Sequence, residues 1–553
     1  MKWSDIVKRS ALRALAALAV LCGSAVAIAA EDPLQAMLAG EFAAQSGDPA
    51  SAARHYLAAA MVSGDPVLAE RAARIALHAG DKVTASRALA RWRQLAPDSP
   101  ALHQASATLA LAGPDRAAAL AAFRRLLAAP GDEGWQRALQ ALASHDDTTE
   151  STALLGQLVA ADALPENPDA WFAFGGLAAR MDQDGLSGQL AEAAARRFPK
   201  APRVWLWQAQ RQRLAERPDA ARKAIEQALE LGGSEPGIRL AAAAELDALG
   251  DSGAAAAVLA EGPQDADTLL GRVAYLARAE RTDALEALYA ELAAGAETAD
   301  DERLFLLGQV AELLKRPAQA LQWYERVAGP EKRSEAVLRQ AVVLEESDRL
   351  DEALARLREL QASDGDDGES IRNAYLLEAE LLLRRERAQD AVAAYDRGLG
   401  IFEDDPQLLY ARALALAELE RIGEAEQDLT RLISMDPSNA DALNALGYTL
   451  ADRTDRLQEA REYIQRAYAL APDSAAIIDS LGWVLYRMGE AEAALVHLRR
   501  AFELQPDPEI AAHLGEALWV TGAAAEARSV WQQGAELDPD NALLRRTMER
   551  LDR

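Results

Sequence analysis

Three stretches near the C-terminal end of the chain carry one pattern: LNALGYTLADR at 443–453, IDSLGWVLYR at 478–487 and AAHLGEALWV at 511–520. Each contains a Leu-Gly pair, and an alanine follows the glycine 12 or 13 residues later. The glycines are Gly447, Gly482 and Gly515, the alanines are Ala460, Ala494 and Ala527, and prolines close the units at Pro437, Pro472, Pro506 and Pro539. Apolar residues recur at helical spacing in both halves of a unit, so this period of about 34 residues predicts a repeated helix–turn–helix.

The pattern resembles the tetratricopeptide repeat family. That family has a small residue where the first helix of a unit meets the second, another small residue early in the second helix, and proline at the end. Helices that cross closely accept only Gly or Ala at the contact, and a larger side chain four residues on fills the space beside it. The resemblance implies an all-α fold, a right-handed superhelical solenoid of about fifteen helix-turn-helix repeats.

The small residue early in the second helix recurs far toward the N-terminus, at intervals of 33 or 34 residues between positions 52 and 255. The positions are Ala52, Ala85, Ala119, Ala153, Ser187, Ala221 and Ala255, and then Ala320, Ala353, Ala391 and Ala425. Between these two runs the register slips, with one unit centred near Ala284 or Leu285. We therefore divide the chain into a signal peptide (1–29), degenerate tetratricopeptide-like repeats (30–300), well-matched repeats (301–541) and a C-terminal capping helix (542–553). The least rigid parts of the repeat array are expected at 261–267, 295–302 and 363–370, which are rich in Gly, Asp and Ser.

Length and charge narrow the class of protein. A single core rarely exceeds roughly 250–300 residues, so a chain of 553 residues is a repeat array or several domains. The formal net charge is −28, which repels phosphate backbones and argues against nucleic-acid binding.

The N-terminal segment has the pattern of a secretory signal. Basic residues precede an apolar stretch that ends in Ala27-Ile28-Ala29, which predicts cleavage before Ala30 and a periplasmic protein. A noncleaved membrane anchor is the alternative. Cys22 is the only cysteine, and its lipidation would attach the chain to a membrane, although Ala19-Val20-Leu21 before it departs from the usual lipoprotein pattern.

Residue patterns for catalysis, metals and cofactors are missing from the sequence. The six histidines form no HExxH motif, and we assign all of them to repeat helices in structural roles. No GxSxG elbow and no phosphate-binding loop occur. The sequence therefore predicts a protein that is not an enzyme and has no catalytic residue, cofactor or metal.

The expected working surface is the concave wall lined by the first helix of each repeat, because stacked repeats form an extended binding surface. Tyrosine and tryptophan on such a wall are typical binding anchors. The predicted partner-binding groove consists of Tyr410, Asn444, Tyr448, Asp479, Trp483, Tyr486, Arg487, Glu516 and Trp519. Sideways packing of the aromatic rings between repeats is the alternative. The Lys and Asn pair with which some repeat domains clamp a carboxylate is missing from the corresponding positions.

A second candidate surface is a basic patch at Arg180, Arg203 and Arg213, within a run of arginines and lysines in an otherwise acidic chain. It is suited to an acidic partner segment. The alternative is a solvated face on which neighbouring carboxylates balance the charge.

Residues 440–541 resemble a bacterial family of exported repeat proteins that includes the lipoprotein adaptor of a carboxyl-terminal processing protease. The residues that carry this resemblance are 443–453 and 479–486. The resemblance implies a scaffold that binds the protease and presents substrates such as peptidoglycan hydrolases in the periplasm. Two alternatives are an assembly factor for an envelope machine, such as a pilus or polysaccharide exporter, and an enzyme with an unrecognised site.

Overall fold

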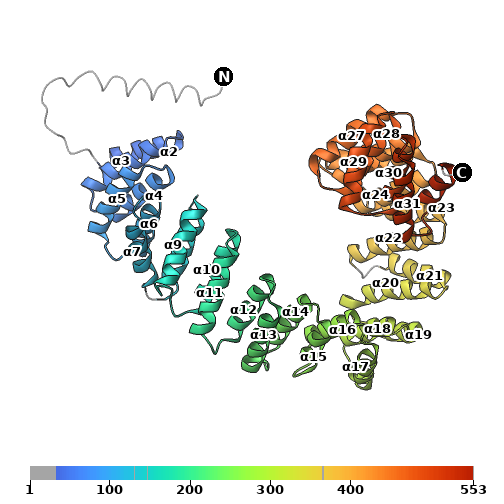
Figure 1. Cartoon of the computed structure of the whole chain (residues 1–553), viewed down its shortest axis with the longest axis horizontal. Coiled ribbons are helices and arrows are strands. Elements are labelled where there is room, and N and C mark those ends of the chain that lie inside the picture. The colour runs from blue at the N-terminus through green and yellow to red at the C-terminus, as the bar shows by residue number, and fades with distance from the viewer. Residues whose placement is uncertain (1–32, 130, 146, 364–366, 552–553) are drawn as a thin grey trace. The chain divides into compact units, whose positions relative to one another are not determined.

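The computed structural model describes residues 33–129, 131–145, 147–363 and 367–551 (Figure 1). These residues form α-helices with one short 3-10 helix and no strand, which confirms the predicted all-α class. The predicted signal peptide, with Cys22, lies outside the described residues. Contacts divide the chain into unit 1, Met1–Ala279, and unit 2, Glu280–Arg553.

Unit 1 is built from antiparallel helices that follow one another in chain order. They are α2 (Pro33–Gln45), α3 (Pro49–Val62), α4 (Pro66–His78), α5 (Lys82–Leu95), α6 (Pro100–Leu111), α7 (Arg116–Leu127), α8 (Glu133–Ala143), α9 (Thr148–Ala160), α10 (Pro168–Arg180), α11 (Asp184–Arg197), α12 (Pro202–Leu214), α13 (Pro218–Gly232), α14 (Pro236–Ala248), α15 (Ser252–Ala260) and α16 (Ala266–Arg278). Many begin with proline at the first position, where its fixed φ suits a helix and its missing N–H costs nothing. Aspartate caps such as Asp81 and Asp115 accept a backbone N–H of the first turn.

Unit 2 continues the same arrangement. Its helices are α17 (Thr282–Ala294), η1 (Ala296–Thr298), α18 (Asp301–Leu313), α19 (Pro317–Tyr324), α20 (Pro330–Glu346), α21 (Leu350–Gln361), α22 (Gly368–Arg384), α23 (Ala388–Leu399), α24 (Pro406–Glu418), α25 (Ile422–Met435), α26 (Ala440–Arg453), α27 (Leu457–Leu470), α28 (Ala475–Arg487), α29 (Ala491–Leu504), α30 (Pro508–Val520), α31 (Ala524–Leu537) and α32 (Ala542–Leu551). Along the described residues, α2 to α31 are thirty successive α-helices, the number that fifteen helix–turn–helix repeats need, and α32 follows alone.

The structure fixes the repeat register that the sequence left open between Ala255 and Ala320, and it places Leu285 at the repeat position. Helix α17 begins after Arg281, and Leu285 lies four residues beyond that cap with 5% of its surface exposed. Ala320 and Ala425 lie at the same distance from the caps Arg316 and Arg421. A leucine therefore occupies the position that alanine fills in the neighbouring repeats, and this hides the period from a search for small residues.

The repeat glycines mark the closest approach of the two helices in a pair. A Cβ added to Gly482 would lie 2.6 Å from Cγ of Leu498, and one added to Gly447 would lie 2.5 Å from Cγ1 of Ile464. At Gly515 the same atom would fall inside the indole ring of Trp531. In each case the blocking side chain lies four residues after the second-helix alanine, as the packing argument predicts.

The last helix closes the stack. α32 packs against α30 and α31, and Leu544 is buried next to Gly534 of α31. Its exposed positions carry three arginines and one glutamate, which is the charged composition that a terminal repeat needs to end a hydrophobic stack in water.

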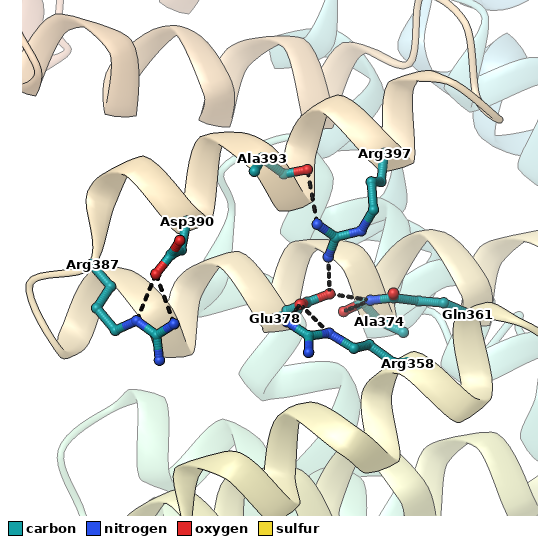
Figure 2. A network of polar contacts seen from close by, with 8 residues as sticks. All are labelled: Arg358, Gln361, Ala374, Glu378, Arg387, Asp390, Ala393 and Arg397. Atoms are coloured by element: carbon teal, nitrogen blue, oxygen red, sulfur yellow. Dashed lines mark hydrogen bonds and ion pairs between the residues drawn. The ribbon is translucent and has the colours of Figure 1, made fainter.

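Buried carboxylates in unit 2 accept hydrogen bonds from neighbouring helices and so hold these helices together. Glu378 on α22 is fully buried, and Figure 2 shows arginines from two other helices converging on it. Arg358 of α21 donates to Oε1 at 2.9 Å, and Arg397 of α23 donates to Oε2 at 2.7 Å. The amide of Gln361 also donates to Oε2, at 2.7 Å. One side chain thus fixes α21 against the following pair, whereas Arg387 and Asp390, also drawn in Figure 2, pair within α23 and its cap.

Replacing Gly482 by alanine is expected to lower the free energy of unfolding by about 1–3 kcal/mol, because the added methyl group overfills the contact with Leu498. Urea unfolding followed by circular dichroism measures this loss. Gly423 is the matched control, since a Cβ there meets nothing within 4 Å and Gly423→Ala should raise stability by about 0.5–1 kcal/mol. Equal effects at both positions would contradict the packing account.

Replacing Glu378 by alanine is expected to cost about 1–3 kcal/mol, because it removes the charge-assisted hydrogen bonds that join three helices, while the half-exposed Arg358 and Arg397 stay hydrated. Glu380→Ala on the same helix removes only the exposed pair with Arg384 and should cost less than about 1 kcal/mol. Thermal unfolding of the two variants compares them directly. Similar melting temperatures for both would show that the buried network does not hold the repeats together.

Candidate partner-binding wall

The first helices of the last four pairs form one surface, which we call the first-helix wall. α24, α26, α28 and α30 contact one another in sequence, whereas contacts between the successive second helices α25, α27, α29 and α31 are weaker. The first helices therefore lie on the more crowded, inner side of this stack. The predicted groove residues all lie on these four helices.

The structure gives the predicted groove residues different degrees of burial. Half-buried are Tyr410, Asn444, Tyr448, Tyr486, Arg487 and Trp519, and buried are Asp479, Trp483 and Glu516. Most of these side chains are therefore partly accessible. The three buried ones pack between neighbouring repeats.

Trp483 is the most enclosed aromatic ring of the wall, with 7% of its surface exposed. Its indole stacks on His513 with ring centroids 4.2 Å apart and on Tyr486 at 5.3 Å. The sequence argument placed this ring toward solvent. The structure differs because first helices of successive repeats approach closely, and a wide indole at that point fills the space between α28 and α30.

Two other aromatic residues of the wall are partly accessible. Trp519 stacks on Trp531 of the following helix at 5.6 Å, and the guanidinium of Arg528 lies 5.0 Å from the centre of its ring. Tyr410 is half-buried, and burial raises the pKa of its hydroxyl. Each ring keeps an edge or a hydroxyl at the surface of the wall, which is how amphipathic aromatic anchors work at interfaces.

A buried histidine joins three first helices. Nδ1 of His513 on α30 lies 2.9 Å from Oδ2 of Asp479 on α28. The other ring nitrogen, Nε2, lies 3.5 Å from the hydroxyl of Tyr448 on α26. Burial alone lowers the pKa of His513, but the carboxylates of Asp479, Asp452 and Glu509 together outweigh it and the net direction is upward.

A second polar contact attaches the terminal helix to the wall. The hydroxyl of Tyr486 donates to Glu516 at 3.0 Å, and Arg550 of α32 donates to the other carboxylate oxygen at 2.5 Å. Burial, together with Glu516, raises the pKa of Tyr486 to about 12. Arg487 donates to the backbone carbonyl of Asp452 at 3.0 Å, so its guanidinium bridges α28 to α26.

Sequence reasoning missed the roles of His513 and Arg550. His513 follows Asp479 by 34 residues, one repeat further along the chain, and this spacing already places the two side chains on facing helices. Arg550 lies on the terminal helix beyond the repeat pattern, so no periodic signal connects it to Glu516.

The basic patch is largely neutralised by carboxylates. Arg213 pairs with Glu245 at 2.8 Å. Arg203 lies 3.6 Å from Asp169 and above the ring of Phe172. Arg180 is exposed at the end of α10. The contacts of Arg203 and Arg213 match the charge-balanced alternative, and the use of the patch by a partner stays a prediction.

Two further features of the described residues concern metal binding and membrane spans. No group of three or more His, Cys, Asp or Glu side chains in that part of the chain is arranged to hold a metal ion. Within the same residues, every helix is too short or too polar to cross a membrane.

Comparison with known proteins supports the repeat assignment. The tetratricopeptide repeat family model matches residues 338–406, 410–475 and 480–542. This part of the chain consists of tetratricopeptide repeats. The predicted groove residues lie within these matches, except Asp479, which falls between two of them. Tetratricopeptide repeats are generally non-catalytic scaffolds for protein–protein interaction.

Matches to individual proteins differ in sequence identity and in the share of each chain that is covered. A curated tetratricopeptide repeat-containing protein of Pseudomonas aeruginosa is 36% identical over 216 residues, which cover 39% of this chain and 36% of that relative. The chain thus spans about a third of the relative's length. A thermophilic tetratricopeptide repeat protein of Thermus thermophilus is 23% identical over 33% of this chain and 100% of its own, with a TM-score of 0.31. The structure of the APC/C hetero-tetramer Cut9-Hcn1 is 14% identical over 94% of this chain and 96% of the matched chain, also with a TM-score of 0.31.

Protonation of His513 is expected to stabilise the fold. A folded-state pKa above the unfolded value means that the contribution is fully present below about pH 6.5 and is lost as pH rises through the folded-state pKa. The excess stability of the wild-type chain over His513→Gln should therefore shrink as pH rises. Urea midpoints between about pH 5 and pH 8 measure it.

His497 provides the matched control. Burial, with Arg500 nearby, lowers the pKa of His497, so the unfolded state binds the proton more readily. The stability difference between wild type and His497→Gln should change with pH in the opposite sense. The same pH trend at both histidines would contradict the pairing of His513 with Asp479.

Proposed function

We propose that this protein is a non-enzymatic periplasmic adaptor whose first-helix wall binds protein partners. In this proposal it presents substrates such as peptidoglycan hydrolases to a carboxyl-terminal processing protease. The observation that carries the binding role is the wall itself: four consecutive first helices present half-buried tyrosine, tryptophan, asparagine and arginine side chains on one continuous surface. Such side chains are the usual anchors of protein interfaces.

The choice of protease rests on sequence. Residues 443–453 and 479–486 carry the resemblance to exported adaptors, and both segments lie on the wall, in α26 and α28. The periplasmic location rests on the N-terminal signal pattern, and attachment to a membrane would further require lipidation of Cys22. An assembly factor for a pilus or polysaccharide exporter is the alternative.

The contacts of the wall indicate which variants test partner binding cleanly. Trp483→Ala would remove a buried ring, and a loss of about 3–5 kcal/mol is typical of such a cavity. Failure of that variant to capture a partner would reflect damaged packing as much as lost recognition. Tyr448 and Tyr486 are half-buried, so replacing them by alanine removes accessible ring surface with a smaller effect on the core.

The test is a crosslinking pull-down from the cell envelope, read by mass spectrometry. The wild-type chain is expected to recover a processing protease and wall hydrolases, and the double variant Tyr448→Ala/Tyr486→Ala should reduce that recovery by at least about thirtyfold, the effect of losing a 2 kcal/mol anchor. The matched control is Tyr448→Phe/Tyr486→Phe, which keeps both rings. Circular dichroism should show unchanged helix content in both variants. Recovery of an export or pilus machine without any protease would favour the assembly alternative.

A further inference from the structure

Three carboxylates converge on one place in the first-helix wall. Asp479 of α28 contacts His513, and His513 in turn contacts Tyr448. Asp452 lies one helical turn after Tyr448 on α26, and Glu509 lies one turn before His513 on α30. We call these three side chains the acidic cluster. They come from three successive repeats, so the cluster exists only when the repeats are stacked.

Asp479 differs from the other buried carboxylates of unit 2. Glu378 and Asp428 have both oxygens paired with arginines, and Glu516 has one oxygen paired with Tyr486 and the other with Arg550. Asp479 is 6% exposed, and its Oδ2 faces His513, but its Oδ1 is buried without a hydrogen-bond partner. A buried carboxylate oxygen without a donor is costly, so this atom marks a place where a donor is missing.

The acceptor at the equivalent position of the preceding repeat is also free. Oδ1 of Asn444 on α26 is buried and has no partner, and Asn444 precedes Asp479 by one repeat. A ligand that brings N–H donors would satisfy both of these acceptors on neighbouring first helices. Two successive repeats of the wall therefore each contain a buried acceptor without a donor.

The charge of the cluster is not balanced from within the chain. Arg453 pairs with Asp452 and with Glu420, and this uses the nearest arginine. In the described residues no lysine or arginine forms an ion pair with Asp479 or Glu509, and Glu509 is exposed at the start of α30. A cation that enters from the wall side would therefore meet Asp479, whose charge only His513 offsets, and Glu509, which has no cationic partner.

We propose that the acidic cluster, with Asn444, receives the side chain of a lysine or arginine from an extended segment of a partner protein; this inference rests on the proposed role of the wall. An ammonium group carries three donors and a guanidinium carries five, so one cation has enough donors for the two acceptors that lack a partner, Oδ1 of Asp479 and Oδ1 of Asn444. The ring of half-buried Tyr448 offers a face to the same cation. The site therefore selects basic segments and rejects acidic ones.

Protonation of His513 opposes the incoming cation. The groups that face this histidine are Tyr448 and Asp452 from α26, Asp479 and Trp483 from α28, and Glu509 on its own helix. A proton on the imidazole adds a positive charge among them. Affinity for a basic segment should therefore rise as pH increases.

Fluorescence anisotropy tests the proposal on the full chain. The probes are fluorescein-labelled alanine-based peptides with spaced lysines, with glutamines or with glutamates at the same positions. The lysine peptide should bind at least about tenfold more tightly than the glutamine peptide, and the glutamate peptide should bind less tightly than either. Binding of the lysine peptide should strengthen with pH and weaken with salt.

Variants locate the site. Asp479→Asn and the exposed Glu509→Gln should each weaken binding of the lysine peptide about tenfold. Glu509→Gln remains informative if Asp479→Asn disturbs the contact with His513, because Glu509 has no role in the core. The matched control is Glu462→Gln, an exposed glutamate on the second helix α27, which should leave affinity unchanged.

The outcomes separate this inference from the proposed function. Equal binding of the lysine and glutamate peptides, or equal losses in Glu509→Gln and Glu462→Gln, would overturn the cation site even if the protease is still captured in the pull-down. Selective lysine binding that is lost in Glu509→Gln would support the site even if the envelope partner proves to be an assembly machine.

Discussion

The close approach of two helices within each repeat is the constraint on which the rest of the structure depends. At Gly447 and Gly482 the backbone of the first helix lies so near the second helix that even a methyl group would collide with Ile464 or Leu498. This approach fixes the geometry of the pair, and the pair fixes how the next repeat stacks. The surface of these repeats therefore depends on contacts between a buried glycine of the first helix and a larger side chain of the second.

Buried charge provides a second constraint, which acts between repeats. Glu378 is fully buried, and its arginine partners come from the preceding and the following helices. A buried carboxylate is tolerated only where donors reach both of its oxygens, so such networks fix the position of one repeat against the next more than they add stability. Asp479 is the exception among the buried carboxylates of unit 2, because one of its oxygens lacks a donor.

The first-helix wall combines packing and recognition in the same side chains. Trp483 and His513 fill the space between neighbouring first helices, whereas Tyr448 and Tyr486 keep part of their surface accessible. A partner that binds this wall would contact side chains that also join the repeats. Binding and the local stability of the last four repeats are consequently coupled, since a ligand that binds only the stacked state stabilises it.

The sequence by itself determined the repeat. Gly447, the alanine 13 residues after it and the closing proline are local signals of helix contact and helix end. The all-α class, the number of pairs and the wall helices could therefore be predicted from the spacing of these residues and from the family that they resemble. Tertiary structure decided which wall residues are buried, that Leu285 occupies an alanine position, and that Asp479 faces His513 but no arginine. These features depend on the distance between first helices of different repeats. That distance is set by the packing of whole helix pairs, and no local pattern encodes it.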